Sequence, residues 1–155
     1  MAADQVPDID PSDDRQAQAG PVQSKIRPVV LIVDDANLLR HVIATVLNAH
    51  GYDSLLARNG QDALEKATIH TVDLVTMDID MPFMDGIEAT RRIRALGGWR
   101  ASVPIIGFSS RDDREDHRCC RDAGMNTLVS KGAGLDVLLE VIQQLVPTIS
   151  VGIER

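Results

Sequence analysis

Short apolar runs alternate with segments of helical period along residues 28–147. The runs are rich in Val, Ile and Leu and have the length of strands. The segments that follow them carry apolar residues at spacings of three and four, which predicts amphipathic helices. This alternation is typical of a doubly wound α/β domain, here a five-stranded parallel sheet flanked by five helices. The predicted strands are 29–33, 53–57, 74–77, 105–108 and 127–129, and the predicted helices are 37–49, 60–69, 86–96, 111–122 and 134–146.

The segment 111–122 differs from the other predicted helices because it is charged on almost every side. Only Cys119, Cys120 and Ala123 are available to face a core, so this helix is marginal unless other contacts hold it. The two cysteines are adjacent, which does not suit a disulfide, and we expect free thiols. The charges indicate either a solvated, salt-bridged face or a partner surface or mobile switch element. Four arginines fall on one side of the segment: Arg111, Arg114, Arg118 and Arg121.

The length of 155 residues leaves room for one domain, predicted at 28–147 between a disordered arm at 1–27 and a short tail at 148–155. The arm is rich in Asp, Gln, Ala, Pro and Ser and has no apolar period. A net charge of −7 disfavours non-specific binding to nucleic acid. No apolar run approaches the ~20 residues that span a bilayer, and the acidic N-terminus is unlike a signal peptide. We therefore expect a cytoplasmic protein without nucleic-acid or membrane partners.

Polar side chains stand where three of the predicted strands end. Asp34 and Asp35 follow the first strand, Asp78 follows the third, and Ser109 follows the fourth. In an open parallel sheet, ligands bind outside the carboxyl ends of the strands. Three acids and a hydroxyl at those ends therefore predict a single site, suited to a divalent metal and a phosphoryl group.

Each residue of this predicted site has a chemical use in phosphoryl transfer. The carboxylate of Asp78 can attack phosphorus and form an acyl phosphate. Asp34 and Asp35 supply the hard oxygen ligands that Mg²⁺ prefers. Ser109 can donate a hydrogen bond to a phosphoryl oxygen, and Lys131, just after the last strand, supplies a compensating cation. Each element is weak evidence alone, but the five in this order are specific.

This set of residues resembles the receiver domain of two-component response regulators. The likeness covers about residues 28–147 and implies the flavodoxin-like receiver fold. With no output segment recognised in the sequence, we expect a stand-alone, chemotaxis-regulator-like single-domain response regulator that signals by protein contact. Four motifs carry the resemblance: VLIVDDAN at 30–37, MDIDMPFMDGIEATRRIRAL at 77–96, PIIGFSS at 104–110 and GMNTLVSK at 124–131.

The resemblance implies a role for each site residue. Asp78 is similar to the phospho-acceptor, Lys131 to the phosphate-binding lysine and Ser109 to the switch hydroxyl of the family. Asp80 and Arg111 match positions that tune the lifetime of the phosphoryl group. The implied Mg²⁺ ligands are Asp35, Asp78, the backbone carbonyl of Asp80 and, through water, Asp34.

The same resemblance implies a phosphohistidine donor, carried by a sensor histidine kinase or a histidine phosphotransfer protein. A receiver catalyses this transfer itself and also much of its own dephosphorylation, so it is not a turnover enzyme in the ordinary sense. The output is an unidentified downstream protein. Homodimerisation through the last two helices or the terminal tails is a habit of the family.

Three other functions stay open at this level. The first is a phosphorelay shuttle intermediate. The second is a haloacid dehalogenase-like phosphatase, because Asp78-Ile79-Asp80 reads as D-x-D after a strand. In that family, however, the motif normally follows the first strand. The third is a receiver-fold binding module that is not phosphorylated, against which the presence of all five site residues argues.

Two residues depart from the family pattern. Gly132 follows Lys131 where the family usually has Pro in a cis peptide. A cis peptide to Gly costs roughly 3 kcal/mol, so we predict a trans and looser loop here. Leu128 stands where the family favours Tyr or Phe, which predicts that any signal travels instead through residues 110–123.

Overall fold

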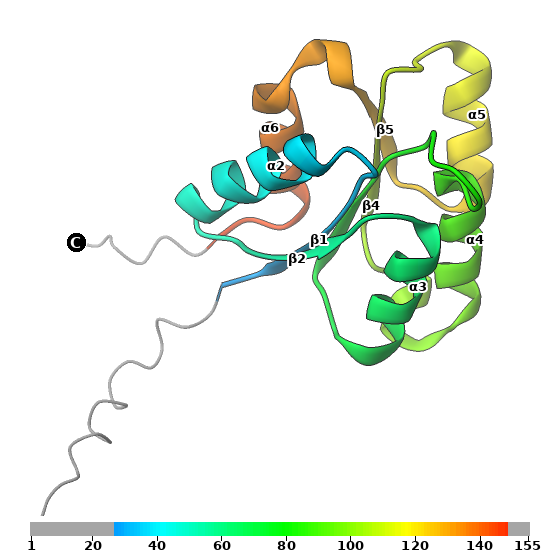
Figure 1. The fold of residues 1–155 in the computed structure, drawn as a ribbon, viewed down its shortest axis with the longest axis horizontal. Coiled ribbons are helices and arrows are strands. Elements are labelled where there is room, and N and C mark those ends of the chain that lie inside the picture. The colour runs from blue at the N-terminus through cyan, green and yellow to red at the C-terminus, as the bar shows by residue number, and fades with distance from the viewer. Residues whose placement is uncertain (1–26, 149–155) are drawn as a thin grey trace, which may run out of the picture.

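The computed structural model describes residues 27–148, which form a five-stranded parallel sheet between two layers of helices (Figure 1). The predicted arm and all but the first residue of the predicted tail lie outside the described residues, apart from Arg27. The strand order is β2-β1-β3-β4-β5, the order of a doubly wound sheet. The strands are β1 (Val29–Val33), β2 (Asp53–Ala57), β3 (Leu74–Met77), β4 (Ile105–Ser109) and β5 (Thr127–Ser130).

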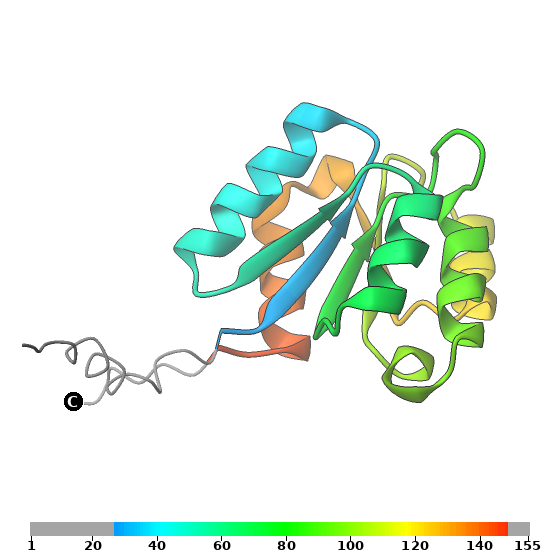
Figure 2. The same cartoon turned by 60° about the horizontal axis from the view of Figure 1, so that its bottom comes forward.

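The helices cover both faces of this sheet. Figure 2 shows α2 and α6 on one face and α3, α4 and α5 on the other. Two short 3₁₀ helices, η3 (Gly98–Ala101) and η4 (Lys131–Ala133), were not predicted from the sequence. The α-helices are α2 (Asn37–Ala49), α3 (Gly60–Ile69), α4 (Gly86–Ala95), α5 (Arg114–Ala123) and α6 (Leu135–Leu145).

The core has two halves, one on each face of the sheet, and β1 contributes to both. Val30 and Ile32 pack with α2 and α6, whereas Leu31 and Val33 pack with α3 and α4. Successive side chains of a strand point to opposite faces. A strand covered on both faces must therefore be apolar at every position, which explains the unbroken apolar runs in the sequence.

Helix α5 begins later than the sequence predicted. Asp113 is its N-cap and forms a capping box with Asp116, so Arg111 lies before the helix and does not belong to an arginine stripe along it. Cys120 and Ala123 are buried as predicted, but Cys119 is exposed. Both cysteines are free thiols, as predicted.

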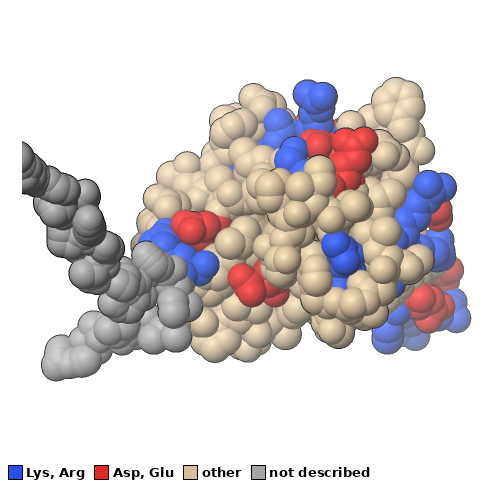
Figure 3. Space-filling model, turned by 90° about the horizontal axis from the view of Figure 1, so that it is seen from below, with Lys and Arg blue, Asp and Glu red and all other residues tan. Residues whose placement is uncertain are grey.

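Charged residues of both signs gather on the side of the molecule formed by α4 and α5 (Figure 3). Arg118 pairs with Glu115 at 2.6 Å, and Glu88 pairs with Arg92 at 2.8 Å. This agrees with the ordinary interpretation of a solvated, salt-bridged face. No helix within residues 27–148 is long and apolar enough to cross a membrane.

Candidate functional site

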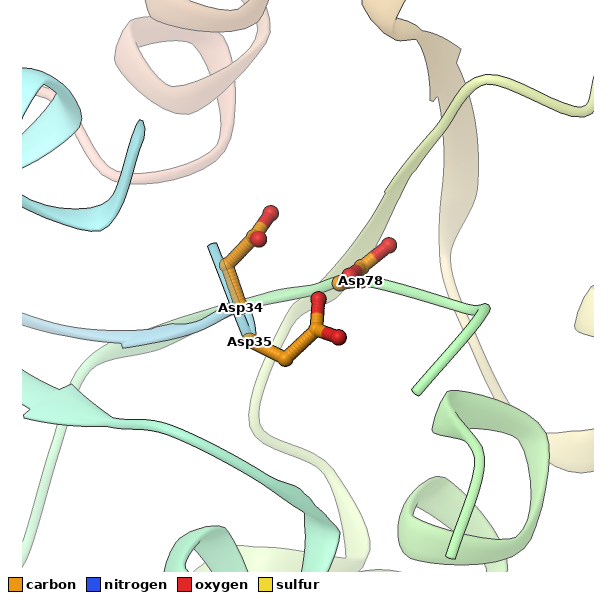
Figure 4. A group of neighbouring side chains, drawn as sticks. All are labelled: Asp34, Asp35 and Asp78. Atoms are coloured by element: carbon orange, nitrogen blue, oxygen red, sulfur yellow. The ribbon is translucent and has the colours of Figure 1, made fainter. Parts of the chain in front are cut away.

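Three carboxylates meet at the carboxyl ends of β1 and β3 (Figure 4). Asp34, Asp35 and Asp78 each offer an oxygen, and these oxygens all lie within 4.8 Å of one another. Asp34 and Asp78 are buried, whereas Asp35 is exposed. The backbone N–H of Asp78 donates to the carbonyl of Val33 at 2.9 Å. The hydrogen bonds between the parallel strands therefore hold Asp78 beside Asp34 and Asp35.

The side chain of Lys131 reaches into this group of acids. Its Nζ lies 3.0 Å from Asp34 Oδ2 and 3.3 Å from Asp78 Oδ1. The Lys131–Gly132 peptide is trans, as predicted. The loop is not left open, however, because η4 forms here and Ser130 Oγ accepts a hydrogen bond from the N–H of Gly132 at 3.1 Å. Ser130 thus orders the backbone around Gly132.

The electrostatics of the site show an excess of negative charge. Burial and the neighbouring charge of Asp34 raise the pKa of Asp78 to about 7, although Lys131 acts in the opposite direction. Burial alone would lower the pKa of Lys131, but its contacts with Asp34 and Asp78 raise it above the usual value. One ammonium group therefore contacts two of three clustered carboxylates. Hard oxygen donors with uncompensated charge fit a divalent cation such as Mg²⁺.

Ser109 and Arg111 lie at the end of β4, beside the acids. The hydroxyl oxygen of Ser109 is buried and accepts a hydrogen bond from the backbone N–H of Arg111 at 3.1 Å. The Arg111 side chain extends from Asp80, at 3.0 Å, to the buried Asp116 of α5, at 2.6 Å. Asp116 was not predicted as part of the site. Its only sequence signal was a spacing of three from Asp113, which is typical of a helix cap.

The loop after Asp78 is shaped by Gly86 and Phe83. A Cβ at Gly86 would lie 2.1 Å from the carbonyl oxygen of Asp78, so only glycine fits there. Phe83 has φ 70°, and the N–H of Met84 donates to the carbonyl of Pro82 at 2.8 Å, which defines a γ-turn with strained geometry. The Phe83 side chain is fully exposed.

Leu128 occupies the position at which the family favours Tyr or Phe. It is buried, and it packs so close to Gly107 that a Cβ there would lie 2.9 Å from Leu128 Cδ1. Its place in β5 opposite Gly107 in the sheet register explains this contact. The position is therefore filled by an aliphatic side chain that belongs to the core.

The sequence matches the model of the response regulator receiver domain over residues 30–143. The chain therefore belongs to this family, whose members accept phosphoryl groups in two-component signalling. The alternative of a haloacid dehalogenase-like phosphatase is not supported, because its D-x-D motif would normally follow the first strand. Here Asp78 follows the third strand of a receiver domain.

The sensor histidine kinase RcsC of Salmonella typhimurium is 35% identical over 114 residues, which are 74% of this chain but only 12% of that protein. This chain thus spans about an eighth of its relative.

Solved structures show the same fold. The chemotaxis protein CheY4 of Vibrio cholerae superimposes with a TM-score of 0.74 and 26% identity, covering 77% of this chain and 99% of that one. The receiver domain of the sensor histidine kinase PA1611 from Pseudomonas aeruginosa superimposes with a TM-score of 0.70 and 31% identity, covering 77% and 97%. That structure contains a magnesium ion coordinated in its active site cleft.

Proposed function

We propose that Asp78 accepts a phosphoryl group from a phosphohistidine in a Mg²⁺-dependent reaction. The observation that carries this proposal is the buried Asp78 carboxylate with Lys131 Nζ at 3.3 Å and two further acids beside it. A carboxylate oxygen of Asp78 forms the new O–P bond while the N–P bond of the donor breaks. The electron pair of that bond returns to the imidazole of the donor.

Three groups of this chain assist the transfer. Lys131 balances the negative charge of the phosphoryl oxygens, because its ammonium group already lies between Asp34 and Asp78. The Ser109 hydroxyl donates to a phosphoryl oxygen while it still accepts from the N–H of Arg111. Asp34, Asp35, Asp78 and the carbonyl of Asp80 would hold Mg²⁺, which supplies charge neutralisation when bound.

Asp80 and Arg111 set the lifetime of the acyl phosphate in this proposal. They pair at 3.0 Å beside the acceptor, where they limit the approach of water. Both side chains are about half exposed, so the pair itself adds little to stability. Its effect is therefore expected on the rate of dephosphorylation.

The donor is a sensor histidine kinase or a histidine phosphotransfer protein, and the reaction takes place in the cytoplasm. A terminal switch that acts on a protein target is the first candidate for the output. The second is a phosphorelay intermediate, which is supported by the likeness to the receiver domain of the sensor kinase PA1611. The stand-alone form and homodimerisation remain predictions from the sequence.

Intact mass after incubation with acetyl phosphate and Mg²⁺ tests the proposal. We expect a gain of one phosphoryl group that is absent in Asp78→Asn and absent when EDTA replaces Mg²⁺. A gain that persists in Asp78→Asn would refute Asp78 as the acceptor. If no gain appears and beryllofluoride with Mg²⁺ also fails to bind, the chain is a receiver-fold binding module and the proposal is wrong.

A further inference from the structure

Asp34 and Asp35 are neighbours at the end of β1, but their carboxylates are held in different ways. Asp34 Oδ1 accepts from the N–H of Ala36 at 2.8 Å, and Asp34 Oδ2 lies 3.0 Å from Lys131 Nζ. Asp35 is exposed, and Figure 4 shows its carboxylate directed toward Asp78. In the described part of the chain, no N–H or ammonium group donates to that carboxylate. The direction of the Asp35 side chain therefore depends on the backbone that carries it.

Arg40 holds this backbone from the first turn of α2. Its Nη1 donates to the carbonyl of Asp34 at 2.8 Å, and its Nη2 donates to Asn37 Oδ1 at 2.7 Å. The carbonyl of Asp34 belongs to the peptide that joins Asp34 to Asp35. Because a peptide is planar, its carbonyl and the Cα of Asp35 move together. A guanidinium that fixes the carbonyl therefore also fixes the direction in which the Asp35 side chain leaves the chain.

Helix α2 begins without the side-chain cap that three other helices have. Its N-cap is Ala36, which has no side-chain oxygen to accept from the first turn. Helices α3, α4 and α5 are capped by Asn59, Asp85 and Asp113. Arg40 therefore supplies side-chain contacts between β1 and α2 at a point where those helices have a cap.

We propose that Arg40 is a positioning residue that orients Asp35 toward a bound Mg²⁺ ion. This inference rests on the proposed function, in which Asp35 is a metal ligand. Mg²⁺ requires near-ideal octahedral geometry, so a small change in the direction of one carboxylate reduces the affinity for the ion. Removal of a group that orients a metal ligand typically weakens metal binding roughly tenfold to a hundredfold.

The charge of Arg40 and its hydrogen bonds have opposite effects on the affinity for Mg²⁺. A positive charge beside the acids repels a divalent cation, so loss of the charge alone should make Mg²⁺ bind more tightly. Loss of the hydrogen bond to Asp34 should make Mg²⁺ bind more weakly. The direction of the change in Arg40→Ala therefore shows which of the two effects is larger.

Isothermal titration with MgCl₂ tests the role of Arg40. We expect the dissociation constant for Mg²⁺ to be about tenfold higher in Arg40→Ala than in the parent. Arg40→Lys keeps the positive charge but has one nitrogen where the guanidinium presents two, so its value should be intermediate. Arg92→Ala is the matched control. It removes the same charge from an exposed ion pair on α4 and should bind Mg²⁺ as the parent does.

Titration with CaCl₂ separates positioning from general damage to the site. Ca²⁺ accepts flexible ligand geometry, so Arg40→Ala should weaken Ca²⁺ binding by no more than about twofold. The preference of the site for Mg²⁺ over Ca²⁺ should therefore fall. Urea unfolding in EDTA verifies that each variant is folded at the temperature of the titrations. An equal loss of affinity for both ions would indicate general damage and would overturn the role of Arg40.

The possible results distinguish this inference from the proposed function. If Arg40→Ala binds Mg²⁺ as tightly as the parent or more tightly, the role of Arg40 is overturned and the function of Asp78 stands. If the parent itself binds no Mg²⁺, this inference fails, and the Mg²⁺ dependence of the proposed function fails with it. Weaker binding of Mg²⁺ with nearly unchanged binding of Ca²⁺ supports the inference.

Discussion

Lys131 Nζ lies 3.3 Å from Asp78 Oδ1, although the two residues are 53 positions apart in the sequence. The same nitrogen also lies 3.0 Å from Asp34 Oδ2. The only ammonium group described at the site therefore contacts both of the buried acids, Asp34 and Asp78. The fold therefore creates a site that is short of positive charge. That shortage has consequences for stability, for metal binding and for phosphoryl transfer.

Asp78→Asn should stabilise the protein in the absence of Mg²⁺. The substitution removes one of three crowded carboxylates and keeps the shape of the side chain. We expect the free energy of unfolding at pH 7.5 to rise by about 1–2 kcal/mol, after allowance for screening by solvent. Urea unfolding with and without Mg²⁺ measures this. Mg²⁺ should stabilise the parent more than the variant, and equal effects of Mg²⁺ on both would contradict this account.

The contribution of Asp78 to the stability of the metal-free protein should fall as pH rises from about 4 to about 7. The pKa of Asp78 is raised from 3.8 to about 7 by folding. Within this window the native state holds a proton that the unfolded state has released, so unfolding becomes easier as pH increases. The difference in unfolding free energy between the parent and Asp78→Asn isolates this group. That difference should widen with pH across the window and then level off; a constant difference would be evidence against the raised pKa.

Lys131→Ala should change metal binding and phosphoryl transfer in opposite directions. Loss of the ammonium group leaves Asp34 and Asp78 without their cation, so Mg²⁺ should bind more tightly. Phosphorylation by acetyl phosphate should become about a hundredfold slower, because the charge that stabilises the phosphoryl oxygens is missing. Isothermal titration and the rate of mass gain measure the two effects. Weaker Mg²⁺ binding together with slower transfer would indicate a damaged fold instead.

Phe83→Gly should make the protein more stable. Phe83 has φ 70° and a fully exposed side chain, so glycine relieves backbone strain and loses no buried contact. Relief of the strain raises the free energy of unfolding, whereas the greater conformational freedom of glycine in the unfolded chain lowers it. The net gain in the free energy of unfolding is about 0.5–1 kcal/mol. Thermal unfolding measures the gain. Phe83→Ala is the matched control, since it removes the same ring but keeps the strained turn, and it should show no such gain.

The sequence predicted the sheet and the acid site well because both depend on strong local patterns. The apolar run of β3 ends directly at Asp78, and the parallel ladder then leaves one position for that carboxylate. Lys131 was found for the same reason, since it follows the last strand directly. The positions of Asp78 and Lys131 follow from where their strands end, and the apolar pattern of the sequence shows where those ends lie.

The start of α5 could not be read from periodicity. Charged residues before and inside this helix look alike in the sequence, and the capping box of Asp113 decides where it begins. Asp116 is buried and pairs with Arg111, a contact between side chains that no periodic pattern reveals. The strained turn at Phe83 likewise depends on the backbone hydrogen bond from the N–H of Met84 to the carbonyl of Pro82.

Trapping of the phosphorylated residue tests the central claim most directly. The protein is incubated with acetyl phosphate and Mg²⁺ and then treated with borohydride, which reduces an aspartyl phosphate to homoserine. Peptide mass spectrometry then locates the change. We expect homoserine at position 78 and at no other acid of the site. Homoserine at Asp34, Asp35 or Asp80 with position 78 intact would contradict this account.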